Sequence, residues 1–120
     1  MTPFLAFGQQ KTQMIFVTIR EEFAPKSMEG MNKMAKDFQK IMQTGGLGVG
    51  IVGTEVNQMI AIANNIKELI EIRKFMTQME EVLSIEYDKS KFVGKYVSKQ
   101  ERIKHDLPLE AEDDDEHDEL

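Results

Sequence analysis

Residues 14 to 19 read Met-Ile-Phe-Val-Thr-Ile and carry the clearest strand signal in the chain. Their β-branched and aromatic side chains favour an extended segment that is buried on at least one face. A helix is predicted next, opened by Pro25 and Ser27 and ended by Gly45-Gly46. Its apolar positions recur at steps of three and four, as an amphipathic helix requires; they are Met28, Met31, Ala35, Phe38 and Met42.

A hairpin is predicted after this helix. Residues 47 to 51 alternate large apolar residues with glycines, which leaves almost no side chain on one face of that strand. Residues 56 to 63 alternate in the same way and form the second arm. We expect the connection between the two arms at residues 53 to 55.

The remaining elements complete an α+β pattern. Asn65-Ile66-Lys67-Glu68 has the form of a capping box and predicts the start of a second helix. Residues 82 to 87 predict the last strand. The order strand, helix, strand, strand, helix, strand is that of the ferredoxin-like βαββαβ sandwich, an antiparallel sheet with two helices on one face. The other face is left to solvent or to a partner.

The 120 residues, 13.8 kDa in all, suffice for one domain. We expect a flexible N-terminal arm over residues 1–12, a core over residues 13–97, and a disordered tail, basic and then acidic, over residues 98–120. Residues 1–105 hold 15 Lys and Arg against 12 Asp and Glu, a net charge of +3, whereas residues 106–120 hold nine acidic residues and no Lys or Arg. A body this weakly basic disfavours nucleic acid as a partner.

Catalytic and metal-binding patterns are not recognisable. Cysteine is absent, which excludes disulfides and thiolate sites. The two histidines, His105 and His117, have no convergent ligands near them in the sequence. Residues 48–53 have the glycine spacing of a dinucleotide fingerprint but lie within a predicted strand and lead into a hairpin, which is the wrong context. We therefore expect no enzyme, cofactor or metal, and no apolar run approaches the ~20 residues that would insert into a membrane.

A partner-contact segment is predicted after the last strand, where lysines and aromatic residues mix. The candidate contact residues are Lys89, Lys91, Phe92, Lys95 and Tyr96. An arm that folds back on the sheet explains the aromatic residues equally well, and the sequence leaves both interpretations open.

The last four residues, His117, Asp118, Glu119 and Leu120, match the address read by the retrieval receptor of the endoplasmic reticulum. The acidic residues before them favour an extended, accessible end. The address predicts a protein of the endoplasmic-reticulum lumen that binds the retrieval receptor. Because residues 1–8 do not form a secretory signal, we expect this chain to be a mature or trimmed form.

Several of these segments resemble the mesoderm-development (Mesd/Boca) family, from about Lys11 to Lys95. The most specific is Lys11-Thr12-Gln13-Met14-Ile15-Phe16-Val17-Thr18; the others are Ile51-Val52-Gly53, Glu71-Ile72-Arg73-Lys74-Phe75 and Phe92-Val93-Gly94-Lys95. The resemblance implies a non-catalytic endoplasmic-reticulum chaperone that assists the folding and trafficking of low-density-lipoprotein receptor family proteins. Its clients would be their β-propeller and EGF modules.

Two other functions share the predicted topology. Residues 15 to 19 look like the first-strand signature of an RNA-binding module, but residues 56 to 63 lack the aromatic residues on which such modules stack bases. A ligand-sensing ferredoxin-like domain is the second alternative, for which the sequence offers no pocket residues either way.

Overall fold

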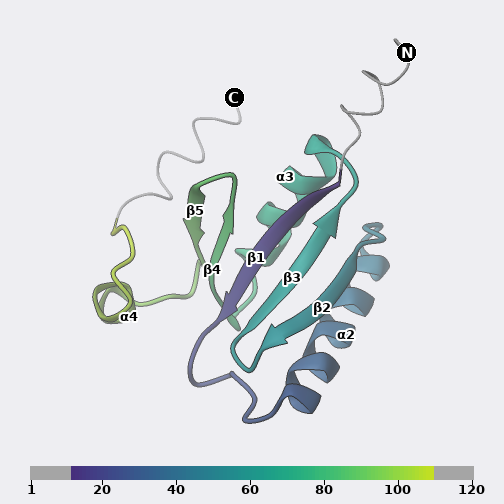
Figure 1. The fold of residues 1–120 in the computed structure, drawn as a ribbon. Helices are drawn as coiled ribbons and strands as arrows, with labels where there is room; N and C mark the ends of the chain where they lie inside the picture. The colour runs from purple at the N-terminus through teal and green to yellow at the C-terminus, as the bar shows by residue number, and fades with distance from the viewer. Residues whose placement is uncertain (1–11, 110–120) are drawn as a thin grey trace.

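The computed structural model of the protein describes residues 12–109, which form a five-stranded antiparallel sheet and three helices (Figure 1). In chain order the elements are β1 Gln13–Ile19, α2 Met28–Thr44, β2 Gly50–Glu55, β3 Gln58–Ala63, α3 Ile66–Met76, β4 Val82–Tyr87, β5 Ser90–Val93 and α4 Lys99–Lys104. The predicted α+β class with an antiparallel sheet is confirmed. Within residues 12–109, no helix has the length and apolar character needed to cross a bilayer.

The strands lie in the order β2-β3-β1-β4-β5, so β1 is central and β2 and β5 are the two edges. Alternate residues of β1 divide between the two faces of the sheet, as a period of two requires. Ile15, Val17 and Ile19 are buried on one face, whereas Met14 and Phe16 are exposed on the other.

The main core lies between the sheet and the helices α2 and α3, which share one face of it. Met31 and Phe38 of α2 and Ile72 of α3 belong to the same buried cluster as Ile15 and Val17 of β1. Figure 1 is viewed from the opposite face, with α3 behind the sheet and α2 running along β2. The sheet therefore has one helix-covered face and one face that α2 and α3 leave open, called here the open face.

Local caps start both long helices at the predicted residues. Ser27 Oγ accepts a hydrogen bond from the Gly30 N–H at 3.0 Å, and Asn65 Oδ1 accepts one from the Glu68 N–H at 2.8 Å. Such caps satisfy N–H groups that have no partner in the first turn. Gly45 and Gly46 follow α2 directly, and Gly46 has a φ of 93°, a left-handed conformation that glycine adopts without strain.

The predicted position of the hairpin connection is wrong by a few residues. The strands β2 and β3 are joined at Val56 and Asn57, not at residues 53 to 55. A register shift between Gly53 and Glu55 adds a residue to β2, and the Asn57 carbonyl accepts a 2.9 Å bond from Ile19 N–H. This long-range bond and the bulge fix the turn, and neither is visible in local sequence.

The expectation of disorder from residue 98 is wrong for residues 98–109. Ser98 and Glu101 form a reciprocal capping box that starts α4, and Leu107 is buried. The segment 94–109, called here the C-terminal arm, is thus part of the fold. The rest of the expected tail, residues 110–120, and nearly all of the expected N-terminal arm lie outside the described residues.

Candidate functional site

The open face of the sheet is apolar across β1, β3 and β2. Strand register places Met14 beside Ile62 and Gly50 in one cross-strand row, and Phe16 beside Ile60 and Val52 in the next. A third row joins Thr18 to Gln58. Together these positions form the candidate interaction surface, called here the open-face patch: Met14, Phe16, Val52, Ile60 and Ile62.

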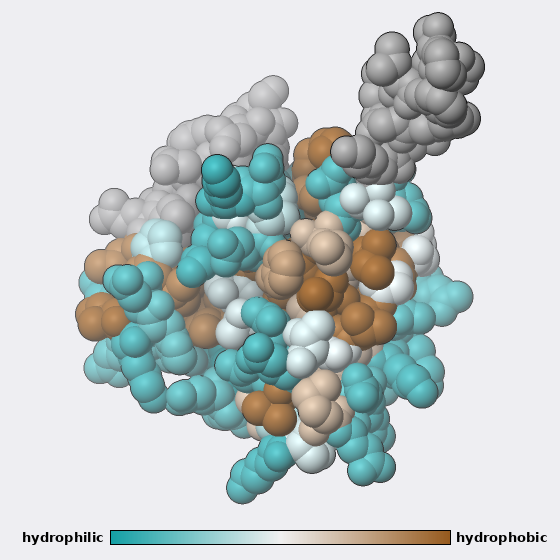
Figure 2. Space-filling view, viewed as in Figure 1, coloured by the Kyte–Doolittle hydropathy of each residue, from teal (hydrophilic) through white to brown (hydrophobic). Residues whose placement is uncertain are grey.

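Three residues of this patch are exposed, and Ile60 and Ile62 between them are half-buried. Met14 is 55% exposed, Val52 53% and Phe16 39%. Figure 2 shows the hydrophobic side chains gathered over β1, β3 and β2 when the molecule is viewed from the open face. Neighbouring exposed apolar side chains of this kind mark interaction surfaces in small proteins, whereas single ones need no explanation.

The patch itself carries no charge, and charged residues lie at the ends of its rows: Glu86 of β4 is opposite Phe16, Lys91 of β5 is opposite Glu86, and Glu55 is opposite Gln58. An uncharged apolar surface binds other apolar surfaces, and it offers nothing to phosphate groups. The arrangement therefore favours contact with exposed apolar segments of a protein.

The other end of the same face is covered. Register places Ser84 beside Thr18, and Val93 beside Ser84, so Val93 lies on the open face too. There it is buried in a second cluster with Leu83 of β4 and with Val97 and Leu107 of the C-terminal arm. The arm thus covers β4 and β5 and leaves the open-face patch bare.

A bulge in β4 makes this second cluster possible. The register steps from Thr18 opposite Ser84 to Ile19 opposite Val82, so Leu83 is an extra residue in the ladder. Val82 consequently packs in the main core and Leu83 in the second cluster. One inserted residue directs adjacent apolar side chains to two separate cores.

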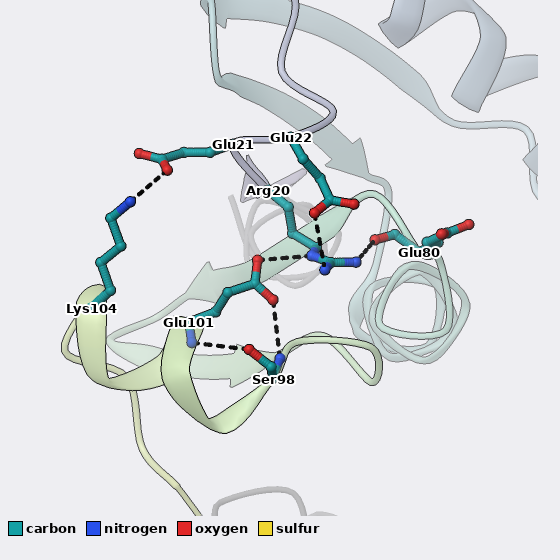
Figure 3. A network of polar contacts seen from close by, with 7 residues as sticks. All are labelled: Arg20, Glu21, Glu22, Glu80, Ser98, Glu101 and Lys104. Atoms are coloured by element: carbon teal, nitrogen blue, oxygen red, sulfur yellow. Dashed lines mark hydrogen bonds and ion pairs between the residues drawn. The ribbon is translucent and has the colours of Figure 1, made fainter.

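Charged contacts hold α4 against the end of β1 (Figure 3). Arg20 Nε donates to Glu101 Oε2 at 3.0 Å, and Arg20 Nη1 donates to the Glu80 carbonyl at 2.8 Å. The first of these bonds holds the pKa of Glu101 below its usual value, despite partial burial. Lys104 also pairs with Glu21 at 2.7 Å, but both side chains are more than 60% exposed, so solvent screens that pair.

The predicted contact residues lie on different surfaces. Lys91 lies opposite Glu86 on the open-face side, whereas Phe92 lies opposite Ile85 on the helix-covered side. Phe92 stacks on Tyr87 with ring centroids 5.4 Å apart, and the Arg73 guanidinium carbon lies 4.5 Å from its ring centroid. Phe92 therefore packs within the fold.

The other predicted contacts are accessible. Lys89 lies in the β4–β5 hairpin with a φ of 67° and is exposed. Tyr96 is 52% exposed, and Lys95 Nζ lies 5.8 Å from the centre of its ring. The backbone N–H of Lys95 bonds the Thr77 carbonyl at 2.7 Å, which fixes the start of the arm beside the end of α3. The retrieval residues His117, Asp118, Glu119 and Leu120 lie outside the described residues.

The glycine-spaced segment serves strand packing. A Cβ on Gly53 would lie 2.7 Å from Met31 Cγ, so a side chain there would collide with α2. At Gly48 and Gly50 a Cβ would meet nothing within 4 Å. Among residues 12–109 there is also no group of three or more acidic or histidine residues that would hold a metal ion.

The open-face patch was missed by sequence reasoning at the level of residues, although its signal is present in β1. Residues 14 to 17 are apolar on both faces of the strand, where a strand with one solvated face would alternate with polar residues. This lack of alternation marks the strand whose exposed face is also apolar.

Comparison of the chain with protein-family models, with curated proteins and with solved structures finds no significant match.

Proposed function

We propose that this protein is a non-catalytic chaperone of the endoplasmic-reticulum lumen that assists low-density-lipoprotein receptor family proteins. It holds their β-propeller and EGF modules while these are incomplete. The observation that carries the proposal is the open-face patch, an uncharged apolar surface at the centre of the sheet. The family resemblance of residues 11–95 supplies the class of client.

The chemistry of the patch suits such a client. Incomplete propeller blades expose apolar faces and strand edges, which pair with other chains unless they are covered. Phe16 and Val52 offer apolar contact without a charge that would have to be desolvated. A contact restricted to a few side chains is weak enough to be reversed when the client has folded.

The fold that we assign is the ferredoxin-like sandwich. Its support is the chain order β1-α2-β2-β3-α3-β4 with the strand order β2-β3-β1-β4, and with α2 and α3 in one core. Strand β5 and helix α4 are additions to that plan. They extend the sheet at β4 and cover part of its open face.

The retrieval address supports the lumenal location. Removal of residues 117–120 from the chain, supplied with a secretory signal, is expected to send the protein into the medium. Retention without these four residues would contradict the proposed address.

An RNA-binding role is the second candidate, because Phe16 is an aromatic residue on the open face of the central strand. Such modules stack bases on aromatic side chains and neutralise phosphates with cations. Phe16 has the apolar Ile60 on one side and the acidic Glu86 on the other, and a carboxylate there would repel phosphate, which favours the chaperone. Salt-dependent binding of single-stranded RNA by the full chain would reverse this preference.

The proposed function is tested with a receptor that contains a β-propeller, co-expressed with the chaperone and scored at the cell surface. We expect the double variant Phe16→Ser and Val52→Thr to lose most of the rescue. The matched control is Ile66→Ser, an exposed apolar residue of α3, on the helix-covered side. Equal rescue by the double variant and the wild type would contradict a role for the open face.

The accessible members of the predicted contact set form a second part of the proposal. Tyr96→Ala is expected to weaken rescue with little change in melting temperature, because Tyr96 is half exposed. Phe92→Ala is expected to lower the melting temperature, because its ring packs on Tyr87 and Arg73. A loss of rescue that simply follows melting temperature in both variants would remove Tyr96 from the contact surface.

A further inference from the structure

The outer edge of β2 presents backbone groups to its surroundings. Among the strands of residues 12–109, β2 is the first of the sheet and pairs only with β3. Ile51 N–H donates to Gln39 Oε1 of α2 at 3.0 Å and therefore points away from β3. Because outward and inward groups alternate along an antiparallel strand, Gly53 has the same outward orientation as Ile51.

The partner of Ile51 is a substitute for a neighbouring strand. A glutamine side-chain amide offers the same acceptor, a carbonyl oxygen, as the backbone of an added strand. Asn32, two turns earlier on α2, has its Oδ1 2.9 Å from the point where a Cβ on Gly53 would lie. Gln39 of α2 thus bonds the edge where a further strand would pair, and Asn32 lies against the helix-covered side of Gly53.

The two edges of the sheet differ in their protection. Proteins protect edges with lysines, proline, bulges or a covering segment. β5 is four residues long, has the exposed Lys91 within it and Lys89 beside it, and leads directly into the C-terminal arm. The edge of β2 is protected by the Gln39 side chain of α2 and by a bulge after Gly53. Residues 50–53 themselves contain neither a charge nor proline, and a Cβ on Gly50 would meet only open space.

We propose that the outer edge of β2, residues 50–53, is a strand-addition site for an extended, uncharged apolar segment of the client. The segment pairs with Ile51 and Gly53 and displaces the Gln39 side chain. This inference rests on the proposed function, since it names the surface on which the client strand is held. The site is continuous with the open-face patch through Val52, so an added strand lengthens the row Phe16–Ile60–Val52.

Two substitutions of Gln39 are expected to change the affinity for an added strand in opposite directions. Gln39→Ala removes the competing acceptor and is expected to tighten binding about three- to tenfold. Gln39→Glu replaces the amide with a carboxylate, a stronger acceptor for the Ile51 N–H, and is expected to weaken binding by a similar factor. Gln43→Ala is the matched control, because Gln43 is an exposed glutamine of the same helix.

The test uses the full chain and a blocked eight-residue peptide of alternating Thr and Val. Its twin is methylated on two adjacent central peptide nitrogens, which blocks pairing on both edges of the peptide without altering its side chains. We expect the first peptide to shift the NMR signals of the Ile51 and Gly53 amides, and the twin to lose this effect. Equal binding of the twin, no binding, shifts confined to β5, or a change in the same direction for both Gln39 variants would overturn the site.

Two further measurements separate this inference from the proposed function and from self-association. If the chain binds an unfolded propeller–EGF fragment and neither Gln39 variant alters that binding, the edge site is overturned and the chaperone stands. If the peptide behaves as expected and the fragment is not bound, the chaperone fails and the edge site stands. A dimer in sedimentation that Gln39→Ala strengthens would assign the edge to a second copy and overturn the client strand.

Discussion

The two ends of the sheet's open face are built from similar residues and treated differently. Over β4 and β5, Leu83 and Val93 are buried beneath the C-terminal arm. Over β1, β3 and β2, Phe16 and Val52 remain exposed. The arm shows that this chain is able to cover apolar side chains on that face, and it covers one end only; the exposed end is the surface on which the proposed client contact rests.

The largest expected loss of stability comes from a substitution at Gly94, where the C-terminal arm begins. A Cβ on Gly94 would overlap the Val82 carbonyl oxygen, which is rigid backbone. Gly94→Ala is expected to lower the free energy of unfolding by more than about 2 kcal/mol, as measured by urea denaturation. Gly48→Ala is the control and should change stability little, because a Cβ there has open space. Equal effects of the two variants would show that the arm does not depend on this close approach.

The second effect concerns the buried leucine of the arm. Leu107→Ala removes a side chain from the second cluster and is expected to cost about 2 kcal/mol, the lower end of the range for core leucines, since this cluster is small. Hydrogen exchange in α4 should accelerate while exchange in β1 stays slow. Leu109→Ala, at an exposed position, is the control. Uniform acceleration over all strands would mean that the arm and the sheet unfold together.

A smaller effect should appear as a dependence on pH. Glu101 has a pKa below its ordinary value of 4.5 because it accepts a hydrogen bond from Arg20. The pKa of Glu101 in the unfolded chain is about 4.5, so its ionised side chain stabilises the fold fully above that pH. This stabilisation is lost as the pH falls through the lower pKa of the folded state. Glu101→Gln is expected to cost about 1 kcal/mol at neutral pH and to flatten the stability profile in that acidic window.

The control for this pH effect is Glu22→Gln, because Glu22 is mostly exposed and lies 3.8 Å from Arg20. Its profile should follow that of the wild type. A wild-type profile that shows no loss of stability between pH 4.5 and the onset of acid unfolding would mean that the Arg20–Glu101 bond does not hold the arm.

The smallest effect on stability is expected from substitutions in the open-face patch. Phe16→Ser with Val52→Thr should change the free energy of unfolding by less than about 1 kcal/mol, because Val52 is half exposed, Phe16 is 39% exposed and neither belongs to a buried cluster. The difference in stability between the double variant and the wild type is measured by circular dichroism during thermal unfolding. A loss as large as that of Leu107→Ala would make the patch part of the structural core, and the contrast between the two ends would disappear.

Much of the fold was predictable because its signals are local. The Ser27 and Asn65 caps satisfy N–H groups within three residues of themselves, and Gly45 ends α2 where the apolar spacing ends. Strand β4 has its predicted bounds. Helix α4 also carries a local signal, the Ser98 to Glu101 capping box, but its basic and then acidic surroundings outweighed that signal and favoured a disordered tail.

The candidate site was less predictable because it depends on which strands become neighbours. Met14 and Ile62 are far apart in the chain, and only the antiparallel register makes them adjacent. The role of Phe92 was likewise not settled by its sequence neighbours, since its partner Arg73 comes from α3. Aromatic residues among lysines fit a contact segment and a folded strand equally well until the packing is known.

The sequence by itself determined the order of strands and helices, since caps, periodicity and turn residues act within a few residues of one another. Only the tertiary structure decided which apolar residues stay exposed. The bulge at Leu83 and the return of Leu107 to the sheet arise from pairings across tens of residues. Burial depends on what lies opposite a side chain, and that is a property of the folded chain rather than of any segment in it.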